Sequence, residues 1–296
     1  MENSDMNEKH AYLIIAHNNW EHLQILVSLL DDLRNDIFIH IDAKSDISSL
    51  HLNTSYSKIV FTKRVNVGWG NVSLIQAEMN LFELASQVEH AYYHLISGID
   101  LPLHSQNYIH KYFDGKNFEY IGYSPKWDMR ERVYCHNLFM QYMRFPNQYI
   151  RGGLQKMRQL YNKLQILVGY KMKQPDYEFK AGCEWVSVTH EFVLSLLDRK
   201  DEILQMYKYA YCPDEIYKQT FAYNSEFRNR IYNVKDEFEG CLREIDWKRG
   251  RPYIWRKEDY DYLSHSNKLF ARKFDENVDE EIINMLINKI KNESNS

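Results

Sequence analysis

Ala11-Tyr12-Leu13-Ile14-Ile15-Ala16 is a short, almost wholly apolar run, followed at once by the polar pair His17 and Asn18. Such a run is typical of a parallel strand buried on both faces of a sheet. The segment from Trp20 to Leu33 then places apolar residues at helical spacing on one face. A buried strand followed by a one-faced helix predicts the first half of a βαβ unit.

The same alternation continues along the chain. Further strands are predicted over residues 36–42, 58–61, 90–96, 119–123, 183–188 and 243–247, with helices over 73–84 and 105–113, and with Ser105 and Thr189 as helix caps. Strands separated by helices predict an α/β fold, a Rossmann-like, mostly parallel sheet with helices on both faces. Ligands of such sheets bind at the carboxyl ends of the strands, which singles out the polar residues there: His17 and Asn18, His40 with Asp42 and Lys44, and Asp100. No GxGxxG follows the first strand and no P-loop occurs, so neither nucleotide fingerprint is supported.

Composition bounds the class of protein. With 296 residues, 44% of them apolar and 26% charged, the chain matches an ordinary globular protein. A net charge of -4 argues against a general nucleic-acid partner. The first residues lack the order of a signal peptide, no apolar run is long enough to span a membrane, and four widely spaced cysteines form no CxxC pair. We expect a cytoplasmic protein with a flexible tail over 1–10, one domain over 11–275, and a C-terminal helix and tail over 276–296.

The segment from 126 to 173 differs in character. Ten basic residues face only Asp128 and Glu131 as acids, and apolar residues at 154, 157, 161, 164, 167 and 168 repeat at helical spacing. A basic amphipathic helix can lie on an anionic membrane, so this insertion is a candidate for peripheral membrane contact or for facing an acceptor. We favour packing of the apolar face against the protein's own core, because most amphipathic helices bury that face in their own domain.

Pro213-Asp214-Glu215 marks a helix start. Proline is pre-organised for the first helical turn, and acids there are stabilised by the amide dipoles. Helix initiation alone therefore explains these residues, and a catalytic base is the alternative. Neighbouring helical residues point about 100° apart, so only one of the two carboxylates can face a substrate. A position near the helix N-terminus favours the ionised form.

Eight short motifs occur in a fixed order: Ala11 to His17, Ile39 to Lys44, Trp69-Gly70, Ser97 to Pro102, Gly182 to Trp185, Pro213 to Glu215, Asp246-Trp247 and Leu269 to Phe274. In this order and at these separations they resemble the Core-2/I-branching N-acetylglucosaminyltransferase and peptide O-xylosyltransferase family, glycosyltransferase family fourteen. The match runs from residue 11 to about 275 and is weakest over the basic insertion. The resemblance implies a GT-A type fold, and the lack of a membrane anchor suggests a bacterial member.

The resemblance also implies an inverting transfer of a sugar from a UDP-sugar to a hydroxyl of a glycan or lipid-linked glycan in cell-surface polysaccharide assembly. It assigns the base to Glu215 and diphosphate contacts to Lys273 and its neighbour Arg272. It places Asp42 near the nucleoside, and Glu119 and Trp247 at the acceptor. Together with the strand-end residues, the predicted donor-binding set is His17, Asp42, Lys44, Asp100, Arg251, Arg272 and Lys273, and the predicted acceptor-binding set is Glu119, Trp185 and Trp247.

Charge on the departing diphosphate must be met by a divalent cation or by fixed protein cations. Arg272 and Lys273 can take that role, so we expect no metal and no cofactor besides the UDP-sugar substrate. The only literal Asp-x-Asp, Asp259-Tyr260-Asp261, is expected to begin a helix instead. His40 and Asp42 share a strand face and could present two ligands. Twelve histidines include no HExxH pair.

The sugar is not fixed by these residues. UDP-N-acetylglucosamine is the preferred donor, with UDP-xylose and UDP-glucuronate as alternatives within the same fold. An alternative of another class is a carbohydrate-binding protein without catalytic activity. The pairing of Glu215 with Arg272 and Lys273 favours the enzyme, because a protein without turnover has no need of both.

Overall fold

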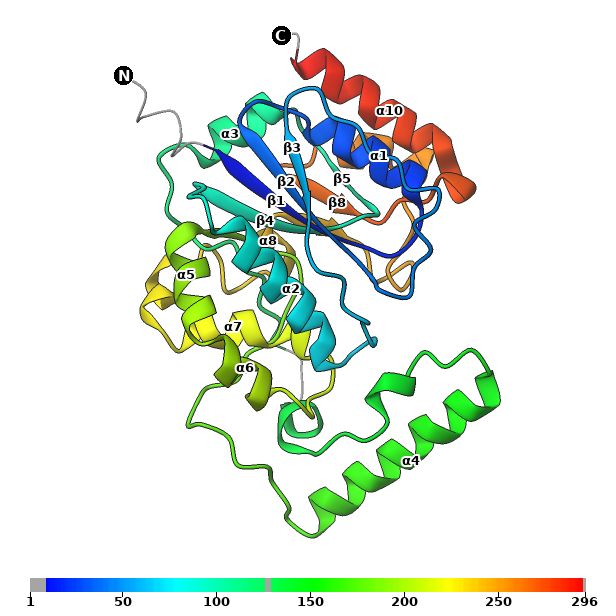
Figure 1. Cartoon of the computed structure of the whole chain (residues 1–296), viewed down its shortest axis with the longest axis vertical. Helices are drawn as coiled ribbons and strands as arrows, with labels where there is room; N and C mark the ends of the chain where they lie inside the picture. The colour runs from blue at the N-terminus through cyan, green and yellow to red at the C-terminus, as the bar shows by residue number, and fades with distance from the viewer. Residues whose placement is uncertain (1–8, 126–128, 295–296) are drawn as a thin grey trace.

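The computed structural model describes residues 9–125 and 129–294, so residues 1–8 of the predicted tail and residues 126–128 of the basic insertion lie outside it. Its centre is a five-stranded sheet in the order β3-β2-β1-β4-β6 (Figure 1). Four strands are parallel, and β6 runs antiparallel to β4. The predicted α/β, mostly parallel sheet is confirmed. Its strands are β1 (His10–Ala16), β2 (Asn35–Ile41), β3 (Lys58–Phe61), β4 (Tyr92–Ser97) and β6 (Ser187–Thr189).

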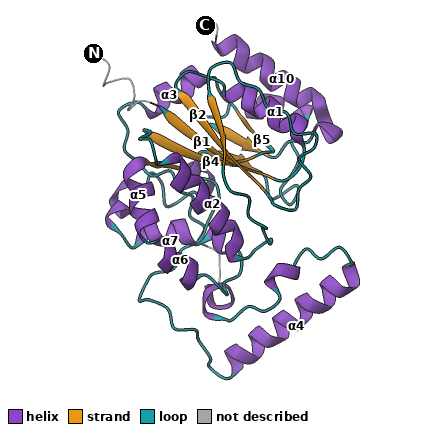
Figure 2. Cartoon of the chain, viewed as in Figure 1, coloured by secondary structure: helices purple, strands orange, loops and turns teal. Residues whose placement is uncertain are grey.

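Helices cover both faces of this sheet, as predicted (Figure 2). Successive side chains of β1 alternate between the faces, because a strand has a period of two. Tyr12 and Ile14 pack in a cluster with α1 (Trp20–Leu30), whereas Ala11 and Leu13 pack in a cluster with α2 (Val72–Ala85) and α5 (His190–Asp198). The two faces of β1 therefore belong to two separate hydrophobic clusters. Burial of each large aliphatic side chain contributes about 1.5–3 kcal/mol to the free energy of folding.

A second, three-stranded sheet joins β5 (Asp100–Pro102), β8 (Phe270–Arg272) and β7 (Arg243–Ile245) in that order. The sequence pattern does not predict β5 as a strand. It pairs antiparallel to β8, and the register sets Asp100 opposite Arg272. Two residues that lie far apart in the chain are thereby brought side by side.

The remaining helices follow the predicted caps closely. The Ser105 side chain accepts from the Tyr108 N–H at 3.3 Å and begins α3 (Gln106–Phe113), and Thr189 caps α5 in the same way. The predicted strand over 119–123 is wrong, because only isolated bridges form there, from Glu119 and Tyr120. Other helices are α6 (Lys200–Met206), α7 (Tyr217–Tyr223), α8 (Glu237–Cys241) and α9 (Tyr260–Ser264), with short turns η2 (Arg130–Tyr134), η3 (Met140–Tyr142), η4 (Pro213–Glu215), η5 (Glu226–Arg230) and η6 (Lys257–Asp259).

The C-terminal helix α10 (Glu276–Ser294) packs beside α1 (Figure 1). Its Ile282, Ile283, Leu286 and Ile290 are buried in the same cluster as β1 and α1. The segment predicted to follow the domain therefore supplies part of its core.

Helix α4 (Gln148–Leu167) stands apart from the sheet and its covering helices (Figure 1). The predicted helix is present, but the favoured packing of its apolar face is wrong. Its buried residues are the polar Arg158, Asn162 and Gln165, while Leu160 and Leu167 are 61% and 80% exposed. In residues 9–125 and 129–294, no helix is both long and apolar enough to cross a membrane.

Candidate active site

Polar side chains gather where β1 and β2 end. The Asp42 N–H donates to the Ala16 carbonyl at 3.1 Å, which extends the strand pairing by one residue. Lys44 Nζ lies 3.3 Å from an Asp42 carboxylate oxygen. Desolvation lowers the pKa of His17, and the charges of Arg272 and Lys44 add to this effect while Asp42 opposes it. The predicted residue His17 thus lies within electrostatic range of Asp42, Lys44 and Arg272.

A cavity of about 580 Å³ opens beside this group. Its lining includes Ile41 at the end of β2, and Thr62 and Arg64 just beyond β3. The Arg64 guanidinium donates to the Asp42 carbonyl at 2.7 Å. The cavity therefore borders the carboxyl ends of the parallel strands, where α/β proteins bind ligands.

Arg272 is held in place from two sides. Its guanidinium lies 3.2 Å from an Asp100 carboxylate oxygen and 4.6 Å from the ring centre of Trp185. Asp100 is 1% exposed and also accepts from the Ser97 N–H at 2.8 Å. Asp100 therefore orients a cation, which differs from the direct donor contact that was predicted for it. Trp185, which is 5% exposed, provides the flat surface on which the guanidinium rests.

Lys273 continues the chain beyond β8. Its carbonyl accepts from the Trp255 N–H at 3.1 Å, and its side chain is half-buried. Among residues 9–125 and 129–294, no carboxylate pairs with its ammonium group. Arg251 and Trp247 lie in the loop after β7, whose Tyr253 carbonyl pairs with the Lys273 N–H at 3.5 Å. Both are exposed, Trp247 by 56%, so the predicted residues share one loop beside Lys273.

The predicted helix start at Pro213 is confirmed in modified form. Pro213–Glu215 forms the single 3₁₀ turn η4, and α7 begins at Tyr217. The two acids separate as expected: Asp214 is buried, whereas 29% of the Glu215 side chain is exposed. Arg132 donates to Glu215 Oε2 at 2.6 Å. The more accessible carboxylate is therefore the one that the sequence predicts as the base.

The protonation of Glu215 differs from the prediction. Burial, followed by repulsion from Asp214, raises its pKa to about 7, and the Arg132 charge opposes both effects. A three-residue turn offers too few aligned amides to outweigh desolvation. The expected preference for the ionised form is therefore wrong, and the carboxyl group titrates near neutral pH.

The segment Gly182 to Trp185 links the two halves of the site. The Gly182 N–H donates to the Glu215 carbonyl at 2.9 Å, and three residues later Trp185 lies against Arg272. One four-residue segment therefore contacts both the turn that carries the proposed base and the cation at the end of β8. Position 182 requires glycine, because a Cβ there would lie 2.0 Å from the Gly122 carbonyl oxygen.

Glu184 is a site residue that the sequence does not single out. Burial raises the pKa of its carboxyl group well above the usual value, with further repulsion from Asp214 and Glu78. Arg272 acts in the opposite direction. Glu184 therefore lies within electrostatic range of both Asp214 and Arg272. Its position within the Gly182 to Trp185 motif was the available signal.

A buried ion pair between α2 and α7 stabilises the η4 turn that carries Glu215. Glu78 of α2 accepts from both Lys218 and Tyr217 of α7, and neither partner of the Glu78–Lys218 pair is exposed. The Lys218 ammonium also donates to the Asp214 carbonyl at 3.1 Å. The pair thereby fastens η4, which carries the proposed base, to a helix of the main sheet.

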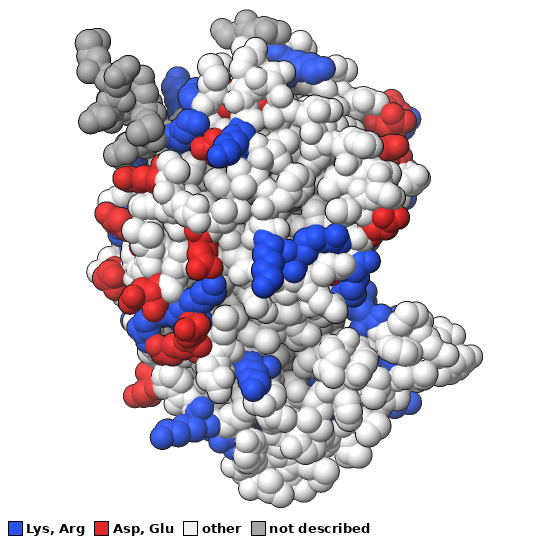
Figure 3. All heavy atoms as spheres, viewed as in Figure 1, with Lys and Arg blue, Asp and Glu red and all other residues white. Residues whose placement is uncertain are grey.

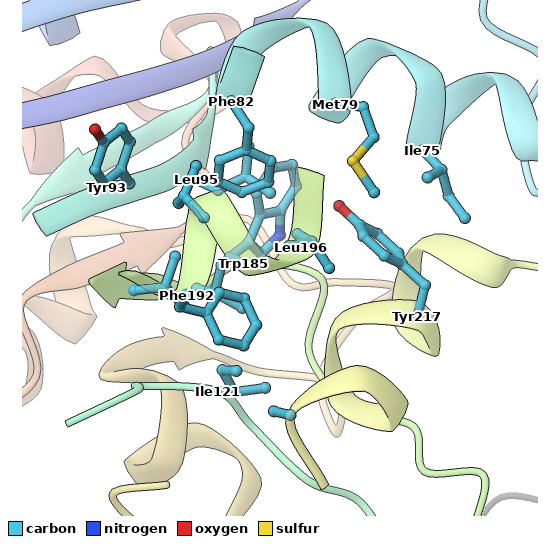
Figure 4. Packing of buried hydrophobic residues seen from close by; sticks show 14 of the residues in the cluster. Ile75, Met79, Phe82, Tyr93, Leu95, Ile121, Trp185, Phe192, Leu196 and Tyr217 are labelled. Carbon is cyan, nitrogen blue, oxygen red and sulfur yellow. The ribbon is translucent and has the colours of Figure 1, made fainter. Parts of the chain in front are cut away.

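Two predicted acceptor residues lie elsewhere than expected. Glu119 is fully buried, and its carboxylate accepts from the Thr189 N–H at 2.9 Å and hydroxyl at 2.7 Å and pairs with Arg230 at 3.1 Å. These contacts fix the start of α5 and leave no open side for a glycan. Trp185 lies against Arg272, and it belongs to the same buried cluster as Phe82 and Leu196, which Figure 4 shows. The sequence could not show this, because strand-end acids and tryptophans look alike whether buried or open.

The alternative metal ligands have structural partners. In Asp259-Tyr260-Asp261 the first carboxylate accepts from the Arg256 N–H at 3.1 Å and pairs with Arg249 at 2.6 Å, so the motif begins a helix as predicted. His40 accepts from the Val65 N–H at 2.9 Å. Within the described part of the chain, no cluster of three or more His, Cys, Asp or Glu side chains is arranged to hold a metal ion.

Comparison with known proteins agrees with the fold. The model of the Core-2/I-branching enzyme family matches residues 10–272. A "Xylosyltransferase" from Ciona intestinalis is 22% identical over 93% of this chain, which spans 33% of that protein. A "Beta-1,3-galactosyl-O-glycosyl-glycoprotein beta-1,6-N-acetylglucosaminyltransferase" from Bos taurus is 22% identical over 91% of this chain, which spans 66% of that protein. These animal relatives give no support to the expected bacterial origin. With a mixed α/β fold of GT-A type and a family match over most of its length, the chain belongs to the Core-2/I-branching enzyme family.

Proposed function

We propose that this protein is an inverting, metal-independent glycosyltransferase that moves a sugar from a UDP-sugar to a hydroxyl of a glycan or lipid-linked glycan. One observation carries the proposal. The segment Gly182 to Trp185 contacts the Glu215 turn at one end and Arg272 at the other, so four residues link a carboxylate that can accept a proton to a cation that can meet a diphosphate. An inverting transfer needs these two groups on opposite sides of one carbon.

In the proposed reaction, the acceptor oxygen attacks the anomeric carbon as the bond from that carbon to the diphosphate oxygen breaks. Glu215 receives the hydroxyl proton, a contribution of about 10²–10⁴ in rate. Arg132 donates to Oε2, and Oε1 is the proposed proton acceptor. The charge that develops on UDP is met by Arg272 and Lys273, and the nucleoside lies toward Asp42 and the adjacent cavity.

The position of Arg272 suits this role physically. A guanidinium already oriented by Asp100 and Trp185 loses little further conformational freedom when it binds phosphate oxygens. The ammonium of Lys273, which pairs with no carboxylate in the described part of the chain, adds a second positive charge next to it. Two fixed cations can take the place of a divalent ion at the departing diphosphate.

For the donor we propose UDP-N-acetylglucosamine, with UDP-xylose and UDP-glucuronate as alternatives. The names of the two relatives include a xylosyl and an N-acetylglucosaminyl transferase at equal identity, so they favour neither sugar. We place the enzyme in the cytoplasm, in cell-surface polysaccharide assembly. Four free, buried cysteines are consistent with a reducing compartment.

A panel of UDP-sugars tests the proposal directly. Released UDP is measured for each donor, first with water and then with a series of glycan acceptors. We expect slow hydrolysis of one donor and faster release when a suitable acceptor is present. Ligand binding is measured in parallel by the thermal shift of the protein. A protein that binds a glycan but no UDP-sugar would instead support the non-catalytic carbohydrate-binding alternative.

A further inference from the structure

The outer face of α4 is an apolar stripe with no partner in the described chain. Its members recur at intervals of three and four residues, which places them on one side of the helix. Leu160, Leu164 and Leu167 are 61%, 49% and 80% exposed. We use the name outer stripe for these exposed residues: Ile150, Met157, Leu160, Tyr161, Leu164, Leu167 and Val168.

The inner face of α4 is polar. Arg158 and Asn162 both donate to the Asn137 side-chain oxygen at 2.9 Å, and Gln165 accepts from the His136 N–H at 2.8 Å. This reverses the usual pattern, in which a helix turns its apolar side inward. The helix is therefore held to the protein by hydrogen bonds while it presents its apolar side outward.

The charged residues around the outer stripe are all basic. Residues 132–175 contain eight Lys and Arg and not one Asp or Glu. Lys156 and Lys163 alternate with Leu160 and Leu167 at positions i, i+4, i+7 and i+11, so both cations border the stripe. In Figure 3 the lobe at the lower right, where α4 lies, shows white and blue surface without red.

We propose that the outer stripe lies on an anionic lipid bilayer, with Lys156 and Lys163 at the headgroups. Apolar side chains enter the interface and the cations meet acidic lipids, which is how basic amphipathic helices bind membranes. A second copy of the chain is a poorer occupant, because two acid-free segments would bring sixteen cations together. This proposal does not depend on the identity of the sugar or on catalysis.

The contact would set the active site near the bilayer. Asn137, which holds α4, also donates to the Glu131 carbonyl at 3.0 Å. The next residue, Arg132, pairs with Glu215 at 2.6 Å. A continuous path of short contacts therefore joins the docking helix to the proposed base, which suits an acceptor anchored in lipid.

Co-sedimentation of the full chain with vesicles tests the docking. We expect binding to vesicles of phosphatidylcholine with phosphatidylglycerol, and little binding to phosphatidylcholine alone. The double variant Leu160→Glu, Leu164→Glu should weaken binding at least about tenfold, because the inserted groups become charged. Lys156→Glu with Lys163→Glu should weaken it by about fivefold or more per site, and added salt should act in the same direction. The matched control is Leu33→Glu, at a leucine that is 70% exposed on the body of the protein.

A second measurement does not disturb the stripe's charge. All four native cysteines are buried, so Leu164→Cys can be labelled selectively with an environment-sensitive fluorophore. We expect a blue shift on addition of anionic vesicles, and none for labelled Leu33→Cys. No binding, or equal binding to neutral vesicles, would overturn the proposal. A dimer that forms without vesicles and disappears in the Leu160→Glu, Leu164→Glu variant would show that a second copy covers the stripe.

Discussion

Arg132 donates a hydrogen bond of 2.6 Å to Glu215, although the two residues lie 83 positions apart in the chain. The pair joins the basic segment to the η4 turn. The same guanidinium also donates to the Tyr211 carbonyl at 3.1 Å and the Cys212 carbonyl at 2.7 Å. One side chain thus fixes both the turn and the carboxylate that it presents. The proposed base is therefore positioned by a residue outside its own element.

Glu215→Gln should abolish proton transfer while keeping the shape of the site. We expect turnover to fall by about 10²–10⁴, with UDP affinity unchanged within about twofold. Initial rates and calorimetric titration with UDP measure the two quantities. Glu226→Gln, at an exposed glutamate, is the matched control. A Glu215→Gln enzyme with full activity would remove this residue from the mechanism.

The pH profile should report the pKa of Glu215, which burial and Asp214 raise to about 7. A base acts only when deprotonated, so activity should rise with pH, reach a plateau above about 7, and fall about tenfold per unit below it. Arg132→Gln removes a charge that lowers this pKa, so the rising limb should move to higher pH. An unchanged limb in Arg132→Gln would argue that another group controls the rate.

Arg272→Ala and Lys273→Met should weaken UDP binding. Each removes a charge-assisted contact to phosphate, which corresponds to about 10–100-fold in affinity. Trp185→Leu should give a smaller loss of the same kind, because Arg272 then lacks its supporting ring. Titration with UDP measures all three, and Lys291→Met, at an exposed lysine of α10, is the control. Unaltered affinity in both Arg272→Ala and Lys273→Met would place the diphosphate elsewhere.

Chelation should leave turnover unchanged. Because two protein cations are proposed to meet the leaving group, we expect equal initial rates with EDTA and with added Mn²⁺. The rates are compared after dialysis against chelator. Activity that vanishes with EDTA and returns only with a divalent ion would contradict the metal-independent mechanism.

Lys218→Met should destabilise the protein, because it leaves Glu78 buried without its cation. Loss of one partner of a buried pair costs about 3–5 kcal/mol in the free energy of unfolding. The double variant Lys218→Met, Glu78→Leu removes both charges and should recover much of that loss. Urea unfolding gives the values. Equal stability of the single variant and the parent would show that the pair contributes little.

Local pattern predicted the main sheet well, because the apolar run of β1 and the helical spacing after it leave few alternatives. The short β5 was missed, since three residues carry no period and the strand exists only through its pairing with β8. The predicted strand over 119–123 is wrong because a strand also depends on pairing with a neighbour, and these residues form only isolated bridges. Its apolar alternation is present, but Glu119 turns inward to hold Thr189 instead of continuing a ladder.

For the site, the order of the sequence motifs predicted that Glu215 and Arg272 belong to one active site. In the structure, the segment Gly182 to Trp185 contacts both the Glu215 turn and Arg272. Burial could not be read from the sequence. It changes the expected charge state of Glu215 and gives Glu119 and Asp100 roles as supports. The direction of α4 was equally hidden, because an apolar face looks the same whether it meets a core or lies exposed.

Helix α4 and its flanking segments, here called the arm, are attached to the rest of the protein through polar contacts and not through the hydrophobic core. Between residues 144 and 173 the buried side chains are Arg158, Asn162 and Gln165, and none of these belongs to the two hydrophobic clusters that hold the sheet. Changes in the length or surface of this segment can therefore accumulate without repacking the catalytic body. An exchange of arms between members of the family could redirect one chemistry to another location or acceptor.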